Sequence, residues 1–362
     1  MKYNKFRFDE ITLNYDKMRI PLSAMERTKR QGTFRYFGAQ GVIDYVDDYI
    51  FDGKYLLIAE DGENLKSKRQ NIAQIVEGKF WVNNHAHIVQ CNEKCILEYL
   101  AYLINGKDVS GYITGSAQPK LSQANLNAME FDIPSIKEQQ DILSILLPIE
   151  QKIRINKEIN NNLEQQVSIL YQSWFEDFEI SNGVCPEDWS YQELSSIADI
   201  ASGKRPPVKS NVCNQETPIS IVGAASVMGF TSEANHTDKI LVTGRVGTHG
   251  VVQRFNTPCW TSDNTLVITS PYYEFTNQIL HRIDYSSMNR GSTQPLITQG
   301  DMKKVVVLVP DENTLAKFEE FAGSLMAKWE ANNKENVKLA SLRDTLLPKL
   351  MSGELDVSNI EI

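Results

Sequence analysis

The nonapeptide GSAQPKLSQ, residues 115–123, recurs as GSTQPLITQ, residues 291–299. The two copies share five of nine residues and lie 176 positions apart. After each copy a strand-like stretch ends in a proline, Pro134 or Pro310, at the same separation. A repeat of this length is too large for a solenoid unit. The chain is therefore two copies of one unit of roughly 180 residues, each made of a domain and an appendage.

The match continues upstream of the nonapeptide, with a slowly changing offset. Residues 81–89 align with residues 260–268 at an offset of 179, and residues 37–42 align with residues 222–227 at an offset of 185. A few loop deletions account for this drift. Both copies hold short β-type runs separated by Gly, Asn and Pro, which predicts a mixed, strand-rich domain with a few helices.

Downstream of the two prolines the pattern becomes helical. Seam residues recur at alternating steps of four and three over ten positions, which is typical of a coiled coil. Over about 33 residues such a helix is roughly 50 Å long. The first seam contains Ile142, Leu146, Ile149, Ile153, Asn156, Asn160, Leu163, Val167, Leu170 and Trp174, and the second contains Phe318, Ala322, Leu325, Trp329, Asn332, Asn336, Leu339, Arg343, Leu346 and Leu350.

Two asparagines interrupt the centre of each seam, Asn156 and Asn160 in the first helix and Asn332 and Asn336 in the second. A buried asparagine in a seam destabilises it unless it meets another amide, so it fixes the register. Antiparallel packing pairs Asn156 with Asn336 and Asn160 with Asn332. The asparagines alone also permit a parallel pair, but the connection through a compact domain favours antiparallel helices. Two separate core helices are the alternative.

The predicted fold is α+β with a pseudo-two-fold internal repeat. Two similar strand-rich domains are separated by two long helices that pack as an antiparallel coiled coil. The predicted segments are residues 1–133 for the first domain, 134–180 for the first helix, 181–309 for the second domain, 310–352 for the second helix and 353–362 for a C-terminal tail.

The net charge of −9 is unevenly distributed. Residues 134–180 and 310–362 each carry a net charge of −4, and the two strand-rich segments are near neutral. A near-neutral domain can gather its Lys and Arg on one face, so nucleic-acid binding stays open. No apolar run approaches the about 20 residues that span a bilayer, and the N-terminus lacks the apolar core of a signal peptide. We expect a cytoplasmic protein with no membrane partner.

We predict no catalytic residues, no cofactor and no metal. The five cysteines are scattered, and His85 and His87 have no third ligand at metal-binding spacing. The sequence contains no GxSxG elbow, HExxH motif or P-loop. It also lacks the Asn-Pro-Pro-Tyr or Asp-Pro-Pro-Tyr segment with which methyltransferases grip a flipped adenine.

The repeated GSxQPxxxQ segment, the strands that end in proline, and two helical stretches resemble the specificity subunit of type I restriction–modification systems. The helical stretches are IPSIKEQQDILSILLPIEQKIRINKEINNNLEQQVSILYQSWF and the closing LRDTLLPKLMSGELDV. The resemblance covers nearly the whole chain. It implies two target-recognition domains, each of which reads one half of a bipartite site in double-stranded DNA. It also implies a coiled coil that sets the spacing and docks two methyltransferase (M) subunits, with motor-nuclease (R) subunits joining later.

Polar and basic loops in the two copies are the predicted DNA contacts. Arg suits guanine and Asn or Gln suits adenine, while Lys and Arg also bind phosphates. The alternative for each loop is a solvated surface. For the nonapeptide we expect first a conformational role, in which Gly and Pro shape the turn and Gln and Ser cap or bridge it, with DNA contact in addition. The candidates in the first copy are Arg27, Lys29, Arg30, Lys66, Lys68, Arg69, Asn83, Asn84, His85, His87, Ser116 and Gln118, and those in the second copy are Lys204, Arg205, Arg245, Thr248, His249, Ser292 and Gln294.

Two other functions stay open on the sequence alone. The first is a non-catalytic coiled-coil scaffold without DNA readout. The second is a fused nuclease or methyltransferase with a cryptic site. Turnover by the isolated chain favours the enzyme, and an unchanged function after charge reversal in the basic loops favours the scaffold. The bases of either half-site do not follow from the sequence, because direct readout depends on loop geometry and indirect readout on DNA shape.

Overall fold

The structure is a computed structural model that describes residues 2–67, 69–115, 118–288 and 296–357. It divides into two compact units, Met1–Arg154 with Asn336–Ile362, and Ile155–Glu335. Both units combine strands with helices, as the α+β prediction requires. Each also takes in part of the two long helices, α5 (Ile136–Phe175) and α8 (Glu312–Ser352).

A six-stranded sheet with the order β2-β7-β5-β6-β3-β4 forms the centre of the first unit. Its longest strands are rich in β-branched and aromatic residues, which favour extended backbone. The longest of them, β6, pairs antiparallel with β5 and, at its C-terminal end, parallel with β3. A separate pair joins β1 to β8. The strands are β1 (Asn4–Arg7), β2 (Thr12–Asn14), β3 (Gln31–Gly38), β4 (Gly41–Val46), β5 (Phe51–Ala59), β6 (Ala73–Val82), β7 (Ala86–Cys91) and β8 (Glu130–Ile133).

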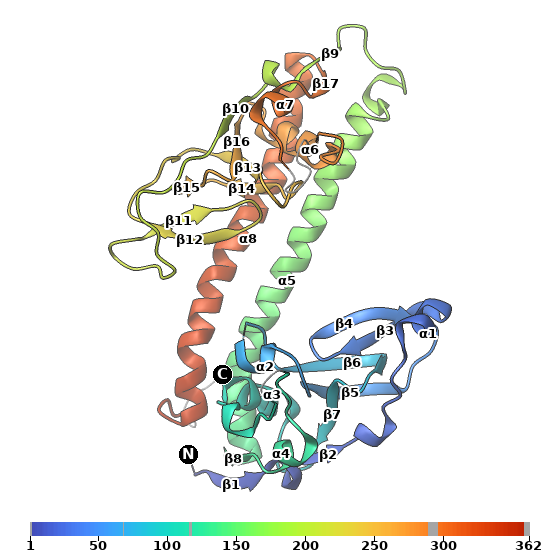
Figure 1. Ribbon diagram of the computed structural model, residues 1–362, viewed down its shortest axis with the longest axis vertical. Coiled ribbons are helices and arrows are strands. Elements are labelled where there is room, and N and C mark those ends of the chain that lie inside the picture. Colours follow the sequence, from blue (N-terminus) through green and yellow to red (C-terminus); the bar gives the residue numbers. More distant parts are fainter. Residues whose placement is uncertain (1, 68, 116–117, 289–295, 358–362) are drawn as a thin grey trace. The chain divides into compact units, whose positions relative to one another are not determined.

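Helices cover one part of this sheet, and α3 packs across β5, β6 and β7 (Figure 1). The main core of the unit lies there: Leu56 and Ile58 of β5 meet Tyr99 and Leu100 of α3, and the unit's parts of α5 and α8 close it. The shorter helices of the unit are α1 (Ala24–Lys29), α2 (Asn64–Ser67), α3 (Leu97–Gly106) and α4 (Gln123–Asn127), with 3₁₀ turns at Phe8–Glu10, Asp16–Met18 and Ser110–Tyr112.

The second unit repeats the strand pairing of the first. Tyr36 of β3 lies opposite Trp81 of β6 in a parallel pair, and Ile221 of β11 lies opposite Trp260 of β15 in the same kind of pair. These partners are related by the offsets of 185 and 179 residues that the sequence contains. The internal repeat is therefore confirmed down to its register.

One strand of the first unit is divided in the second. The counterpart of β6 consists of β14 and β15, and the residues between them include Pro258. Proline has no N–H to donate and is poorly tolerated within a central strand. The second unit consequently has two smaller sheets, with the orders β10-β16-β13-β14 and β12-β11-β15, and a separate pair of β17 with β9.

The elements of the second unit follow the same order as those of the first. Its strands are β9 (Ser190–Glu193), β10 (Asp199–Ser202), β11 (Ile219–Val222), β12 (Val227–Thr231), β13 (Ile240–Gly244), β14 (Gln253–Phe255), β15 (Cys259–Thr261), β16 (Thr265–Thr269) and β17 (Val306–Val309). Its short helices are α6 (Tyr273–Arg282) and α7 (Gln299–Lys303), with 3₁₀ turns at Glu179–Ser181 and Leu194–Ser196.

Within the second unit the two long helices run antiparallel. The Asn332 side chain donates a hydrogen bond to Oδ1 of Asn160 at 2.8 Å, as the seam predicts. The amide of Asn160 in turn donates to the Trp329 carbonyl at 3.2 Å. Asn156 donates to Oε2 of Glu335 at 2.8 Å. Asn336 belongs to the first unit, so its pairing with Asn156 stays a prediction. Among the described helices, none is long and apolar enough to cross a membrane.

Candidate nucleic-acid interface

The described residues at the two ends of the first nonapeptide are joined on the first unit. The backbones of Thr114 and Lys120 exchange two hydrogen bonds of 2.8 Å, which bring the ends of the loop together. Gly115 has a φ of +85°, and a Cβ there would lie 2.2 Å from the Gln118 carbonyl oxygen, so only glycine fits. Gln118 is exposed. The predicted turn-forming role of the glycine is thus confirmed.

The last residues of each nonapeptide begin a short helix. Ser122 accepts the N–H of Asn125 at 3.2 Å and caps α4. Thr298 accepts the N–H of Asp301 at 3.1 Å and caps α7 in the second unit. Ser and Thr are preferred caps because their oxygen satisfies an N–H that has no partner within the helix. The two nonapeptides therefore share a role at the junction of loop and helix.

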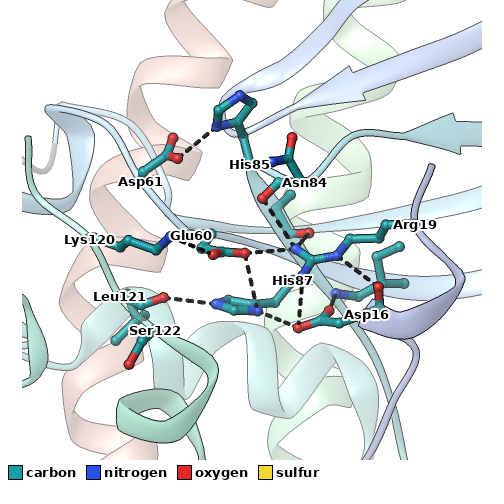
Figure 2. A network of polar contacts seen from close by, with 12 residues as sticks. Asp16, Arg19, Glu60, Asp61, Asn84, His85, His87, Lys120, Leu121 and Ser122 are labelled. Carbon is teal, nitrogen blue, oxygen red and sulfur yellow. Dashed lines mark hydrogen bonds and ion pairs between the residues drawn. The ribbon is translucent and has the colours of Figure 1, made fainter. Parts of the chain in front are cut away.

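A network of charged side chains holds the first loop against the sheet (Figure 2). Lys120 Nζ lies 3.1 Å from Oε1 of Glu60, the residue after β5, and the Leu121 N–H donates to the Glu60 carbonyl at 2.7 Å. Arg19 reaches Oε2 of the same Glu60 at 2.7 Å. The guanidinium of Arg19 also donates to the Ala86 carbonyl at 2.9 Å.

His87 connects this network to the loop. Its Nδ1 lies 2.6 Å from Oδ2 of Asp16, and its Nε2 lies 2.8 Å from the Leu121 carbonyl oxygen. Burial by itself raises the pKa of Asp16, but the hydrogen bond and charge of His87, the Ile88 N–H and the charge of Arg19 together outweigh burial and lower it. Burial likewise raises the pKa of Glu60, and the hydrogen bond from Arg19 together with the charge of His87 lowers it. Both carboxyl groups are therefore held ionised.

The turn before β7 separates the four polar candidates at 83–87 into two groups. Asn84 and His85 are exposed, and His85 Nδ1 lies 2.6 Å from Oδ2 of Asp61. Asn83 is buried, and its side chain accepts the His85 N–H at 2.8 Å. His87 is fully buried. Direct DNA contact at Asn83 and His87 does not fit this geometry, because the protein surrounds both side chains.

In the second unit the loop after β13 takes the place of the Glu60 region. The Arg245 carbonyl accepts the Ile297 N–H at 3.0 Å, which repeats the bond between Glu60 and Leu121. His249 Nδ1 lies 3.1 Å from the Gly244 carbonyl, and Thr248 is exposed. Within the described part of the chain, Arg245 Nε and His249 Nε2 have no hydrogen-bond partner. Both atoms are shielded from solvent, although the two residues as wholes are partly exposed.

A tryptophan anchors a loop at the same place in each unit. Trp81 donates its indole N–H to the Ile20 carbonyl at 2.6 Å, and Trp260 donates to the Lys204 carbonyl at 2.8 Å. In the second unit this loop carries the predicted contacts Lys204 and Arg205, both exposed. The Arg205 side chain is 87% exposed and lies 3.7 Å from Asp263. The anchor fixes the loop backbone while its basic side chains extend into solvent.

The basic candidates near α1 are mostly bound to the protein itself. Arg27 pairs with Asp44 at 2.9 Å, and Arg30 pairs with Asp47 at 2.9 Å. Their guanidinium groups also lie over the rings of Tyr36 and Trp81, at 5.3 and 4.7 Å from the ring centroids. Such contacts stabilise the hairpin of β3 and β4. Lys29 is exposed.

The remaining candidates divide by whether the structure describes them. Lys66 and Arg69 are exposed beside α2. Lys68, Ser116, Ser292 and Gln294 lie outside the described residues. No group of three or more His, Cys, Asp or Glu that could hold a metal occurs in the described residues.

Sequence reasoning missed the charged residues beneath the loop: Asp16, Arg19, Glu60 in this role, and Lys120. They come from three separate stretches of sequence and follow no period, so no pattern joins them. The alignment of the two repeats contains one indication of this site, because Glu60 aligns with Arg245 at the offset of 185. A charge reversal at matched positions indicates a place where the two copies diverge.

Comparison with known proteins gives consistent matches. The family model described as type I restriction modification DNA specificity domain matches residues 2–165 and again residues 186–334. The S.HindORF215P specificity subunit of Haemophilus influenzae is 33% identical over 138 residues. That alignment covers 38% of this chain and 35% of the relative.

A second relative matches over a longer stretch. The type I restriction enzyme MjaIX specificity subunit of Methanocaldococcus jannaschii is 26% identical over 307 residues, which is 73% of this chain and 70% of that protein. Among solved structures, the S subunit of a type I restriction–modification system from M. genitalium has a TM-score of 0.64 at 16% identity. The superposition covers 97% of this chain and 96% of that chain, so the two share a fold.

Proposed function

The chain belongs to the family of type I restriction–modification DNA specificity domains, and from this premise we propose that its two units read the two halves of a bipartite DNA site. As a specificity subunit the chain is not an enzyme. The proposal gives each copy of the repeat one half-site in double-stranded DNA. This function requires a location with the cell's DNA, in the cytoplasm.

The observation that carries the proposal is the repeated anchoring of loops in the two units. In each unit a nonapeptide begins a capped helix and is bonded through its backbone to the residue after the central strand. In each, a tryptophan holds a second loop by its carbonyl. Rigidly held loops with exposed polar side chains suit base readout, because readout requires fixed donor and acceptor positions.

The residues proposed for DNA contact are those that are exposed or partly exposed among the described residues. Phosphate contacts suit the basic side chains, and base contacts suit the amide and imidazole groups. In the first unit they are Lys29, Lys66, Arg69, Asn84, His85 and Gln118, and in the second they are Lys204, Arg205, Arg245, Thr248 and His249.

We further propose that α5 and α8 set the distance between the half-sites and dock the partner subunits. The support is the exposure of large apolar side chains on these helices, including Ile169 at 66% and Phe321 at 56%. Exposed apolar residues on a helix that already buries its seam indicate a protein contact. The proposed partners are two methyltransferase (M) subunits, with motor-nuclease (R) subunits joining the complex.

The test is to express the chain with its methyltransferase subunit and to locate methylated bases in the DNA of those cells. The expected result is one split motif with a fixed gap. Replacing residues 1–133 with the corresponding domain of another family member should change one half of the motif and leave the other. An unsplit motif, or a change in both halves, would overturn the proposal.

The spacing can be tested in the same assay. Seven residues inserted at matched positions in both α5 and α8 keep the heptad seam and lengthen each helix by about 10 Å. The gap between the half-sites should grow by about three base pairs, while both half-sites stay the same. A matched insertion into the β3–β4 turn is the control and should leave the gap unchanged. If the gap stays fixed in the lengthened protein, the helices do not set it.

A further inference from the structure

His87 has acceptors on both sides of its ring. The side chain is 1% exposed, and it lies beneath the first nonapeptide loop. One ring nitrogen faces the Asp16 carboxylate at 2.6 Å and the other faces the Leu121 carbonyl at 2.8 Å (Figure 2). The second oxygen of Asp16 accepts the Ile88 N–H at 2.8 Å, as expected of an ionised carboxylate.

A carbonyl oxygen and an ionised carboxylate accept hydrogen bonds and donate none. Both nitrogens of His87 must therefore carry hydrogen, and the ring is an imidazolium. The charged groups around it suit this state. Asp16 and Glu60 are negative, with Glu60 3.8 Å from Nδ1, while Arg19 and Lys120 pair with Glu60 at 2.7 and 3.1 Å. A neutral ring would turn a lone pair toward one of the two oxygens.

The second unit holds its loop without this charge. Leu266 aligns with His87 at the offset of 179, and Ile297 aligns with Leu121 at 176. Both residues are fully buried, and the backbone bond from Ile297 to Arg245 is retained at 3.0 Å. The backbone bond is thus common to both units. The bond from a charged ring to the loop carbonyl is an addition in the first unit.

We propose that His87, as a buried imidazolium, is a positioning residue for DNA readout by the first unit. It holds the Leu121 carbonyl and thereby fixes the described part of this loop, residues 118–123, from which Gln118 extends into solvent. His87 itself does not touch DNA. This inference rests on the proposed function, since it assigns the anchored loop to one of the two half-sites.

The protonation state is measured on the unmodified protein. The chain contains five histidines, so ¹⁵N labelling of histidine alone gives a small set of ring signals. The His87→Gln variant identifies the signal that belongs to His87. The expected result at neutral pH is a ring with both nitrogens protonated. A ring with one protonated and one bare nitrogen would overturn the inference, and the protonation itself is read on the unmodified protein.

The positioning role is measured with His87→Gln on the full chain in its methyltransferase complex. A neutral glutamine cannot donate to both oxygens at once. We expect faster hydrogen exchange at the Leu121 amide and binding about tenfold weaker to the split site found by methylation mapping. The loss should depend on the half-site of the first unit and be absent for DNA in which that half is scrambled. His281→Gln, an exposed histidine of the second unit, is the control and should bind normally.

Lys120→Leu provides a second variant in case His87→Gln does not fold. The second unit has Leu296 at the position that corresponds to Lys120. The substitution removes the ion pair with Glu60, and the Lys120 side chain is half exposed, so little packing is lost. Its binding loss should be smaller and confined to the same half-site. Unchanged binding in the variants, or faster exchange at Leu121 without weaker binding, would overturn the inference. Failure of the unmodified complex to recognise any split site would instead show that the proposed function is wrong.

Discussion

Asn332 on α8 and Asn160 on α5 form a side-chain amide pair, with Nδ2 of Asn332 2.8 Å from Oδ1 of Asn160. Both residues are buried, at 1% and 5% exposure. Each has an apolar neighbour on one side along its seam, Leu163 or Trp329, and the pair satisfies polar groups where water has little access. This relationship fixes which turn of one helix faces which turn of the other, as a polar seam position does in coiled coils generally.

Replacing Asn332 with leucine should therefore destabilise the second unit. The Oδ1 atom of Asn160 loses its donor, and an unsatisfied buried acceptor costs about 1–3 kcal/mol. The double variant Asn160→Leu with Asn332→Leu should lose less than the sum of the single variants. Urea unfolding of the four proteins gives the coupling energy. Asn162→Leu, an exposed position on α5, is the control, and strictly additive effects would contradict the interpretation.

A partly buried carboxyl group makes the stability of the second unit depend on pH. Glu319 on α8 accepts the N–H of Phe275 at 2.8 Å and of Glu274 at 3.1 Å, at the start of α6. Burial raises the pKa of Glu319 to about 7, although these two hydrogen bonds oppose the rise. A raised acid pKa means that the folded state retains a proton which the unfolded state has already lost. The contribution is fully present below the ordinary pKa of 4.5 and is lost as the pH rises through about 7.

The free energy of unfolding should accordingly fall between about pH 5 and pH 8 through this group. Glu319→Gln should flatten that part of the profile, because the amide does not titrate. Chemical denaturation at a series of pH values measures the slope. Glu320→Gln changes the next residue, which is exposed, and should keep the original slope. A Glu319→Gln protein with an unaltered profile would show that another group is responsible.

Two arginines of the second unit should differ sharply in their effect on stability. Arg254 and Glu274 form a two-point ion pair of 2.7 and 2.6 Å, with side chains 10% and 3% exposed. Arg254→Ala leaves the Glu274 carboxylate buried without its partner, which costs about 3–5 kcal/mol. Arg205→Ala removes an 87% exposed side chain and should change stability by less than about 0.5 kcal/mol. Equal losses on thermal unfolding would refute this contrast.

The same exposed arginine should matter for DNA. Arg205 and Lys204 extend from the loop that Trp260 anchors. Replacing both with alanine should weaken binding and reduce the slope of log affinity against log salt by about one for each phosphate that the variant no longer neutralises. Lys328→Ala, which removes an exposed charge from α8, should leave the slope unchanged. If the double variant kept the unmodified protein's slope of log affinity against log salt, the phosphate contacts would lie elsewhere.

Much of the fold was predictable because its signals are local or periodic. The offsets of 185 and 179 place Tyr36 and Trp81 in the first unit where Ile221 and Trp260 lie in the second. The heptad seam predicted the facing of Asn160 and Asn332. Both depend on spacing along the chain, which a single sequence contains.

The interior of the candidate site was not predictable in the same way. Alternation along a strand suggests that His85 and His87 share a face, but β7 begins at Ala86. His85 therefore lies in the preceding turn and pairs with Asp61, while His87 faces the core. The hydrogen-bond partners of His87 come from segments far apart in the sequence. No spacing in the sequence shows that these segments pack against each other. Asn83 and His87 are buried, whereas Asn84 and His85 are exposed, and this difference is visible only in the structure.

Tyr3 and Met351 lie close together in the first unit, with the tyrosine hydroxyl 3.4 Å from the methionine carbonyl oxygen. Because these residues are in contact, a linker can connect the segment after α8 to the segment before β1, with the chain opened between α5 and β9. Such a circularly permuted chain would keep the hydrogen bonds described above. It would also be translated in the opposite domain order. The fold therefore leaves open which of the two units comes first in the gene.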